Sequence, residues 1–134
     1  MNVVDSSCWL EFIEDSSIGD MVAPIIADVE HLVVPTIVLY EVFRKLTAMK
    51  DSGYAKGFIQ GMLVANIVPL DIPLSLSAAN IGQKYQLAMA DSIIYATTMR
   101  RNAILWTADK HFDGLPSVRY FDKSQPTEPL ANSK

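Results

Sequence analysis

Short apolar segments of strand length recur along this chain, and each is followed by residues with the spacing of a helix. The clearest are residues 2–4 (Asn-Val-Val), 32–34 (Leu-Val-Val) and 103–106 (Ala-Ile-Leu-Trp). Strands that are apolar on both faces are typical of a parallel sheet buried between helices, whereas a sheet with one wet face alternates apolar and polar residues. The pattern therefore predicts an α/β fold with a mainly parallel central sheet.

Capping signals and breaks indicate the remaining elements. We expect helices over residues 8–13, 36–50, 54–65, 74–87 and 90–101, and weaker strands over residues 66–70 and 118–121. Thr36 suits the N-cap of its helix, and Asp51-Ser52-Gly53 divides residues 36–65 into a helical hairpin. A weaker helix is expected over residues 21–29, where Pro24 is tolerated only in the first turn.

The length of 134 residues fits one compact domain with one core. We assign residues 1–122 to this domain and residues 123–134, which hold two prolines and little apolar content, to a mobile C-terminal tail. No run approaches the roughly 20 apolar residues of a membrane span, and the N-terminus lacks the features of a signal peptide. We therefore expect a cytoplasmic protein. Cys8 is the only cysteine, which excludes an internal disulfide and a structural zinc site.

The charge balance opposes general binding to polyanions. The formal net charge is −4 and the pI is near 5.0, whereas non-specific affinity for nucleic acid comes mainly from neutralising phosphates. Half of the residues are hydrophobic (50%) and the mean hydropathy is +0.20, which is high for a small soluble domain. Some apolar surface is therefore expected to contact a partner.

Four acidic residues occupy similar positions in the predicted elements. Asp5 and Asp109 leave apolar strands, whereas Glu41 and Asp91 lie at or near the starts of helices. Asp5 taken alone favours an N-cap, and Asp91 suits an N-cap as well as a metal ligand. Glu41 has a possible partner in Lys45, four residues on, but its helix is apolar on nearly every side. Burial of this carboxylate without a cation would cost far more than such a pair returns.

Taken together, the four acids point to a metal site. In a parallel sheet, strand ends and the starts of the following helices lie on one rim, where ligands bind. Carboxylates crowded there cannot all remain ionised unpaired, so they bind hard divalent cations or take up protons. Oxygen ligands without His or Cys favour Mg²⁺ or Mn²⁺ over Zn²⁺. Asp113 favours a turn before Gly114, with a further ligand position as the alternative.

The acidic residues belong to motifs that resemble a known family, the PIN-domain nucleases. Within that family the chain is similar to the VapC-like toxin ribonucleases of toxin-antitoxin pairs. The matching stretches, in order, are residues 3–7, 40–42, 90–96 and 105–109. The resemblance implies a PIN-like three-layer α/β/α sandwich with a helical hairpin. It covers nearly the whole chain and leaves only the tail outside.

The resemblance also assigns roles to individual residues. It implies that Asp5, Glu41, Asp91 and Asp109 are catalytic and coordinate Mg²⁺ or Mn²⁺, and that Ser7 and Thr107 give polar support. Such a cation would lower the pKa of a bound water and stabilise the charge of a phosphodiester under attack, so no side-chain nucleophile is needed. The product would be a cut RNA strand.

The implied partners are an RNA substrate, a cognate antitoxin protein and a second copy of the chain in a homodimer. The antitoxin would dock on the hairpin of residues 36–65 and direct an Arg at the acids. Basic residues near the acidic motifs are weak candidates for binding RNA phosphates, since each suits a solvated charge at least as well. These residues are Arg44, Lys45, Arg100, Arg101, Lys110 and His111. His111 favours a surface position over a role as catalytic acid.

Three other functions are compatible with parts of the sequence. A PIN-like module that binds RNA or protein without cutting remains the main alternative, because a fold does not guarantee activity. A phosphoacceptor receiver domain would use Asp71 as acceptor, but it needs an acidic neighbour that Asp5 lacks. A haloacid-dehalogenase-like phosphatase needs a second Asp where this chain has Ser7.

Overall fold

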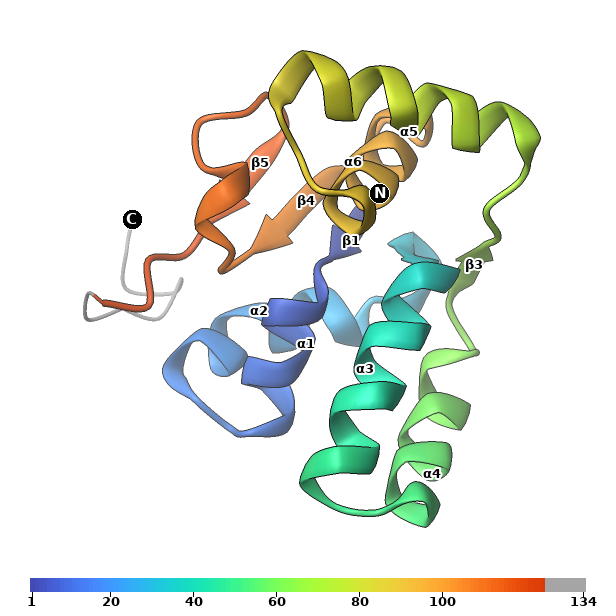
Figure 1. Cartoon of the computed structure of the whole chain (residues 1–134). Helices are drawn as coiled ribbons and strands as arrows, with labels where there is room; N and C mark the ends of the chain where they lie inside the picture. Colours follow the sequence, from blue (N-terminus) through green and yellow to red (C-terminus); the bar gives the residue numbers. More distant parts are fainter. Residues whose placement is uncertain (125–134) are drawn as a thin grey trace.

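A wholly parallel, five-stranded sheet forms the centre of the computed structural model, which describes residues 1–124 (Figure 1). The strands are β1 (Asn2–Val4), β2 (Leu32–Pro35), β3 (Asn66–Val68), β4 (Ile104–Thr107) and β5 (Val118–Tyr120). Their order is β3-β2-β1-β4-β5, and Val3 of the central strand pairs with Val33 and Leu105. From β1 the chain adds β2 and β3 on one side and then β4 and β5 on the other, so the strand order reverses between β1 and β4. In open parallel sheets, ligands bind at such a switch point.

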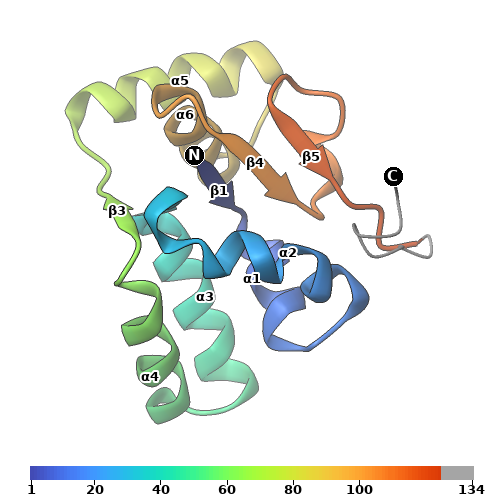
Figure 2. The same cartoon turned by 180° about the vertical axis from the view of Figure 1, so that it is seen from behind.

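Six helices surround this sheet. They are α1 (Ser6–Ile13), α2 (Ser17–Ala27), α3 (Thr36–Met49), α4 (Ser52–Met62), α5 (Ile72–Tyr85) and α6 (Met89–Arg100), with short 3₁₀ turns at η1 (Val29–His31) and η2 (Lys110–Phe112). Figure 1 shows α5 and α6 together beside the sheet and the α3–α4 hairpin reaching away from it. Seen from behind, α1 and α2 lie side by side (Figure 2). The predicted helical hairpin is confirmed.

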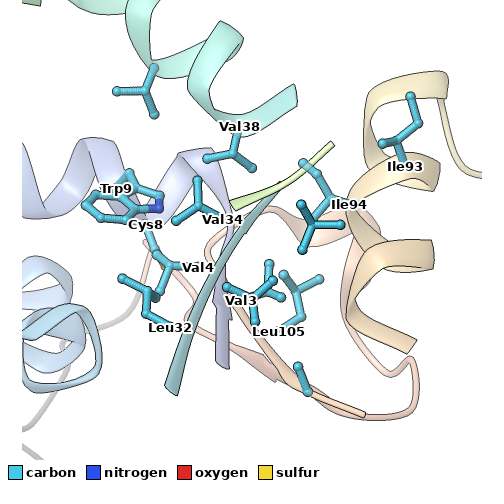
Figure 3. Close-up of a cluster of buried hydrophobic side chains, with 14 of the residues drawn as sticks. Val3, Val4, Cys8, Trp9, Leu32, Val34, Val38, Ile93, Ile94 and Leu105 are labelled. Carbon is cyan, nitrogen blue, oxygen red and sulfur yellow. The ribbon is translucent and has the colours of Figure 1, made fainter. Parts of the chain in front are cut away.

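The core lies on both faces of the sheet, as the continuous apolar strands predict. Figure 3 shows Val4 of β1 facing Cys8 and Trp9 of α1, while Val3 faces Ile94 of α6. Val3, Val4, Cys8 and Ile94 are completely buried. Helices thus cover the two faces of the sheet, and the predicted three-layer α/β/α sandwich is confirmed.

The predicted start of α2 is wrong. The helix begins at Ser17 instead of residue 21, because the hydroxyl of Ser16 accepts a hydrogen bond from the amide of Gly19 (3.0 Å) and caps it. Pro24 therefore lies inside the helix, on an exposed position. Thr36 is the first residue of α3 and the N-cap is Pro35, so the predicted cap is also displaced by one residue.

Two further expectations concern the ends of the chain and membranes. The predicted tail of residues 123–134 lies outside the described residues except for Lys123 and Ser124. Within residues 1–124, none of the helices combines the length and the apolar character that crossing a bilayer requires.

Candidate active site

The four predicted acids line one pocket of about 340 Å³ at the carboxyl ends of the central strands. Asp5 directly follows β1, and Asp109 comes two residues after the end of the neighbouring strand β4. Glu41 lies in the second turn of α3, and Asp91 lies in the first turn of α6. The parallel sheet thus brings together side chains that are far apart in sequence.

Asp5 is the most buried of the four, with 3% of its surface exposed. Its carboxylate accepts hydrogen bonds from the Ser6 amide (2.9 Å) and from the hydroxyls of Ser7 and Thr107 (2.8 Å each). Burial raises the pKa of Asp5, and the two hydroxyl hydrogen bonds oppose that rise. Asp5 therefore caps α1 and also lies in the pocket, so the two sequence interpretations do not exclude each other.

Ser7 and Thr107 connect the ends of β1 and β4. Besides donating to Asp5, the Ser7 hydroxyl accepts a hydrogen bond from the Ala108 amide (3.0 Å), and the Thr107 hydroxyl accepts one from the Asp109 amide (2.9 Å). Each hydroxyl therefore donates one hydrogen bond and accepts another. The same contacts that orient the Asp5 carboxylate also fix the backbone that carries Asp109.

One oxygen of the Glu41 carboxylate lacks a partner within residues 1–124. Its Oε1 atom is buried and has no hydrogen-bond partner among the described residues, and the alternative ion pair with Lys45 does not form there. Burial raises the pKa of Glu41, and the nearby charges of Asp5 and Asp109 raise it further. An unpartnered carboxylate oxygen is costly in such a place unless a ligand satisfies it.

Asp91 lies in the first turn of α6 but does not cap it, since the N-cap residue is Ala88. Burial raises the pKa of Asp91 to about 6, and the charges of Asp109 and Asp5 add to the rise. The structure therefore rules out the N-cap explanation of Asp91. Asp109 does act as a cap, because its Oδ1 atom accepts a hydrogen bond from the His111 amide (2.9 Å) at the start of η2.

His111, which the sequence offers only as a weak candidate for binding RNA phosphates, lies beside two of the acids. Its Nδ1 atom lies 3.1 Å from Asp109 Oδ1 and 3.5 Å from Asp91 Oδ2, although 75% of the side chain is exposed. The expected surface position is correct, but the ring also faces the acids. The turn of η2, which follows Asp109 directly, brings it there.

The basic residues divide into two groups. Lys45 lines the acidic pocket, and Lys110 is exposed in η2 directly after Asp109. Lys123, which sequence reasoning missed, lines the pocket too and lies 3.8 Å from Glu11. No local motif signals Lys123, because this first residue of the predicted tail comes to the pocket only through the fold.

Arg100 and Arg101, two of the weak candidates for binding RNA phosphates, lie away from the acids. Both residues are at the far end of α6, about 13 Å along the helix axis from Asp91. Arg100 instead pairs with Asp71 at 3.2 Å. Arg44 is exposed and donates a hydrogen bond to the Tyr40 hydroxyl (3.2 Å).

Asp113 has the turn position that its sequence context favours. It ends η2 as an exposed residue, and Gly114 follows with a φ of 86°, a left-handed conformation that suits glycine. It does not line the acidic pocket.

The donor atoms of the pocket fit a divalent cation. One oxygen each from Asp91 and Asp109 and a ring nitrogen of His111 lie within 4.8 Å of one another. Asp5 and Glu41 line the same pocket, and the buried Glu41 oxygen has no partner among the described residues. Several carboxylates with so few positive groups among them form the kind of environment that binds hard cations.

Sequence comparison assigns this arrangement to a family. The chain matches the model of the PIN domain over residues 3–117. The chain belongs to the PIN-domain family. The resemblance in the acidic motifs is thereby confirmed, and the receiver-domain and phosphatase alternatives are excluded. No curated protein matches this PIN domain by sequence.

Solved structures with the same fold come from bacterial toxin-antitoxin systems. A toxin-antitoxin complex from Klebsiella pneumoniae superposes with a TM-score of 0.75 at 18% identity, covering 89% of this chain and 96% of that one. DNA-bound VapBC from Salmonella typhimurium superposes with a TM-score of 0.68 at 12% identity, covering 90% of this chain and 96% of that one. The sarcin-ricin loop cleaving toxin VapC20 from Mycobacterium tuberculosis superposes with a TM-score of 0.66 at 14% identity, covering 92% of this chain and 91% of that one. At these identities the likeness shows a shared fold.

Proposed function

We propose that this PIN domain is a Mg²⁺- or Mn²⁺-dependent endoribonuclease and the toxin of a toxin-antitoxin pair. The observation that carries the proposal is the buried Glu41 oxygen, which lacks a hydrogen-bond partner among the described residues and lies in the same pocket as three further carboxylates. A divalent cation would satisfy that oxygen and offset the burial and the repulsion that together raise the pKa of Asp91 to about 6. These features support a pocket whose four carboxylates would hold a cation next to the phosphate of the substrate.

The residues of the pocket have separate tasks in this mechanism. Asp5, Glu41, Asp91 and Asp109 would hold the cation, which when bound supplies an activated water and stabilises charge on the phosphodiester. Ser7 and Thr107 orient Asp5 through their hydroxyls, so that this carboxylate does not rearrange during the reaction. Lys45 and Lys123 on the pocket wall attract the phosphates on either side of the bond to be cut.

RNA is the proposed substrate class. The Mycobacterium tuberculosis toxin with this fold is described as cleaving the sarcin-ricin loop, which is RNA. The acidic surface charge of this chain disfavours long, non-specific contacts with a duplex. Recognition of a short exposed RNA segment at the pocket fits this charge balance.

A cognate antitoxin is the proposed protein partner. An apolar groove of about 280 Å³ lies between α1 and α4 and is lined by Trp9, Phe12, Phe58 and Met62, among others. Helix α4 belongs to the hairpin on which the family resemblance implies that an antitoxin docks. A small upstream reading frame whose product binds the chain, but not the Phe58→Glu variant, would support the pairing.

A homodimer is proposed through the α5–α6 surface. Ile72 and Leu76 of α5 and Met89 of α6 are 78%, 65% and 76% exposed, so both helices leave large apolar side chains open to a partner. Light scattering after gel filtration should give twice the chain mass, and Leu76→Glu should reduce it to one chain.

Cleavage of RNA by the purified protein tests the proposed activity. Wild type should cut RNA with Mg²⁺ or Mn²⁺ and stop when EDTA is added, and Asp5→Asn and Asp91→Asn should not cut. Asp71→Asn is the matched control, because it makes the same change outside the pocket. Cleavage that persists in Asp5→Asn or Asp91→Asn would show that a contaminant cuts the RNA.

The main alternative is a PIN domain that binds RNA or protein without cutting it. The same assay distinguishes the two functions, since such a module would retain RNA in a gel-shift measurement and leave it intact with either metal. The buried, unpartnered Glu41 oxygen favours the nuclease, because a binding module has no need of such a group.

A further inference from the structure

The side chain of His111 approaches two of the pocket acids from outside. Its Nδ1 atom contacts Asp109 Oδ1 at 3.1 Å and Asp91 Oδ2 at 3.5 Å. The backbone amide of the same residue donates to Asp109 Oδ1 (2.9 Å). The 3₁₀ turn that Asp109 caps therefore fixes both the acid and the ring beside it.

These separations match neighbouring ligands of one small cation. An octahedral ion with ligands at about 2.1 Å has adjacent ligand atoms about 3 Å apart and opposite ones about 4 Å apart. The two His111 contacts fall near the first value, and the three donor atoms all lie within 4.8 Å of one another. One ion can therefore contact Asp91, Asp109 and the ring nitrogen after small side-chain movements.

Another histidine shows what an ordinary surface pair looks like in this protein. His31 Nδ1 makes hydrogen bonds of 3.0 Å to both oxygens of one residue, Asp28, three positions earlier. His111 instead shares its nitrogen between carboxylates from two separate elements, and both carboxylates line the acidic pocket. The buried Glu41 oxygen, which has no partner within residues 1–124, independently indicates that this pocket takes a ligand.

We propose that His111 is a metal ligand through Nδ1, so that the metal centre combines carboxylate oxygens with one imidazole nitrogen. The inference rests on the proposed metal-dependent function and specifies its metal. Mg²⁺ prefers oxygen ligands, whereas imidazole nitrogen favours transition-metal ions. The centre therefore binds Mn²⁺, and Co²⁺ still more, in preference to Mg²⁺. The oxygen-only ligand set expected from the sequence is extended by one nitrogen.

Metal binding measured without RNA tests this assignment. Isothermal titration with Mg²⁺, Mn²⁺ and Co²⁺, together with the visible absorption of bound Co²⁺, would be recorded for wild type and His111→Ala. We expect His111→Ala to lose Co²⁺ and Mn²⁺ affinity by on the order of tenfold or more, and Mg²⁺ affinity by less than about threefold. The Co²⁺ spectrum should change as the nitrogen ligand is lost.

Two further variants sharpen the result. His111→Asn offers an amide oxygen near the position of Nδ1, so it should keep Mg²⁺ binding and lose the preference for Co²⁺. His31→Ala removes a histidine that contacts an aspartate outside the pocket, and it should bind all three ions as wild type does. Both histidines are largely exposed, so folding is not expected to change.

The outcomes separate this inference from the proposed function. If His111→Ala binds Co²⁺ as tightly as wild type, with the same spectrum, the ring is only an ion-pair partner and the inference is wrong. Asp91→Asn should lower the affinity for all three ions. If wild type binds none of them, or Asp91→Asn binds them unchanged, the proposed metal centre fails as well.

Discussion

Two aspartates at the starts of neighbouring helices have opposite environments. Asp71 caps α5 by accepting a hydrogen bond from the Leu74 amide (2.9 Å), and Arg100 lies 3.2 Å away. The cap and Arg100 lower the pKa of Asp71. Asp91, near the start of α6, caps nothing and has only 15% of its side chain exposed. Burial and two neighbouring acids raise the pKa of Asp91 to about 6.

The contrast shows that position in a helix does not decide what an aspartate does. Asp71 is ionised in a place that favours its charge, so it stabilises the fold. Asp91 is held where its charge is disfavoured, and this arrangement is useful only if a ligand compensates it. Asp5 resembles Asp91, because its carboxylate is buried without a cationic partner among the described residues. Only two hydroxyls and one amide donate hydrogen bonds to it. The acids of the pocket are therefore expected to matter for activity, and Asp71 for stability.

Exchange of each aspartate for asparagine should separate the two environments most strongly. Asp91→Asn removes a proposed metal ligand, so RNA cleavage should fall by on the order of 100-fold or more. Asp71→Asn keeps the cap and lies outside the pocket, so cleavage should stay within about twofold of wild type. Initial rates with a fluorescent RNA in Mn²⁺ measure both. Equal losses in the two variants would contradict the division between them.

The hydroxyls that support Asp5 provide the next test. Thr107→Val removes a buried donor to Asp5 and the acceptor of the Asp109 amide, and should lower Mn²⁺ affinity or cleavage roughly tenfold. The loss of buried hydrogen bonds should also destabilise the fold by roughly 1–3 kcal/mol. Chemical denaturation and metal titration measure the two effects.

Thr98→Val is the matched control for this variant. Thr98 is as deeply buried as Thr107, but its hydroxyl donates to the Ile94 carbonyl within α6 and contacts no acid. Its Mn²⁺ affinity should equal that of wild type. If Thr107→Val retains wild-type metal affinity as well, the hydroxyl is a structural group and does not position Asp5.

The fold could be predicted because its signals are local. Runs such as Leu32-Val33-Val34 have apolar side chains on both faces, which only a covered parallel sheet can bury. The start of α2 was missed because its cap depends on one hydroxyl, that of Ser16, in a stretch where Pro24 suggested a later start. Helix ends are set by single contacts of this kind, whereas a buried strand is set by its whole composition.

The site could be predicted only where sequence fixes position in three dimensions. Asp5 and Asp109 follow adjacent parallel strands, so their convergence follows from the sheet. Sequence order could not place Arg100, because α6 carries this residue about 13 Å along its axis from Asp91. Lys123 lines the pocket through the return of the chain, and the 3₁₀ turn after Asp109 brings His111 beside Asp109 and Asp91. No residue pattern encodes either contact.

The pH dependence of stability should also distinguish the two aspartates. The folded-state pKa of Asp91 is about 6, above the ordinary value of 3.8, so the stability present below pH 3.8 is lost as the pH rises through 6. In full, this pKa shift would correspond to about 3 kcal/mol in the free energy of unfolding, and screening by solvent at the partly exposed Asp91 reduces this to about 1 kcal/mol. The metal-free protein should therefore melt about 3 °C lower at pH 7 than at pH 4 through this group.

Thermal melts in EDTA across this range check the sign. Burial raises the pKa values of Asp5 and Glu41 too, so they add to the same trend, and Asp91→Asn should flatten the slope without removing it. Asp71→Asn should leave the slope unchanged, because a lowered pKa acts only below the ordinary value of 3.8. Saturating Mn²⁺ should raise the melting temperature at pH 7 more than at pH 4. A metal-free protein that becomes more stable from pH 4 to pH 7 would contradict the raised pKa values.

The smallest expected effects belong to Asp71 itself. Asp71→Ala removes the cap of α5 and should lower the melting temperature by about 2 to 5 °C, with cleavage unchanged. Asp71→Asn keeps the cap and loses only the ion pair with Arg100. The side chains of Arg100 and Asp71 are 39% and 48% exposed, so the melting temperature of this variant should stay within about 1 °C of wild type. Melts at low and high salt separate the two contributions, because salt screens an exposed ion pair but not a cap. If Asp71→Asn is destabilised as much as Asp71→Ala, the Arg100 pair and not the cap stabilises the start of α5.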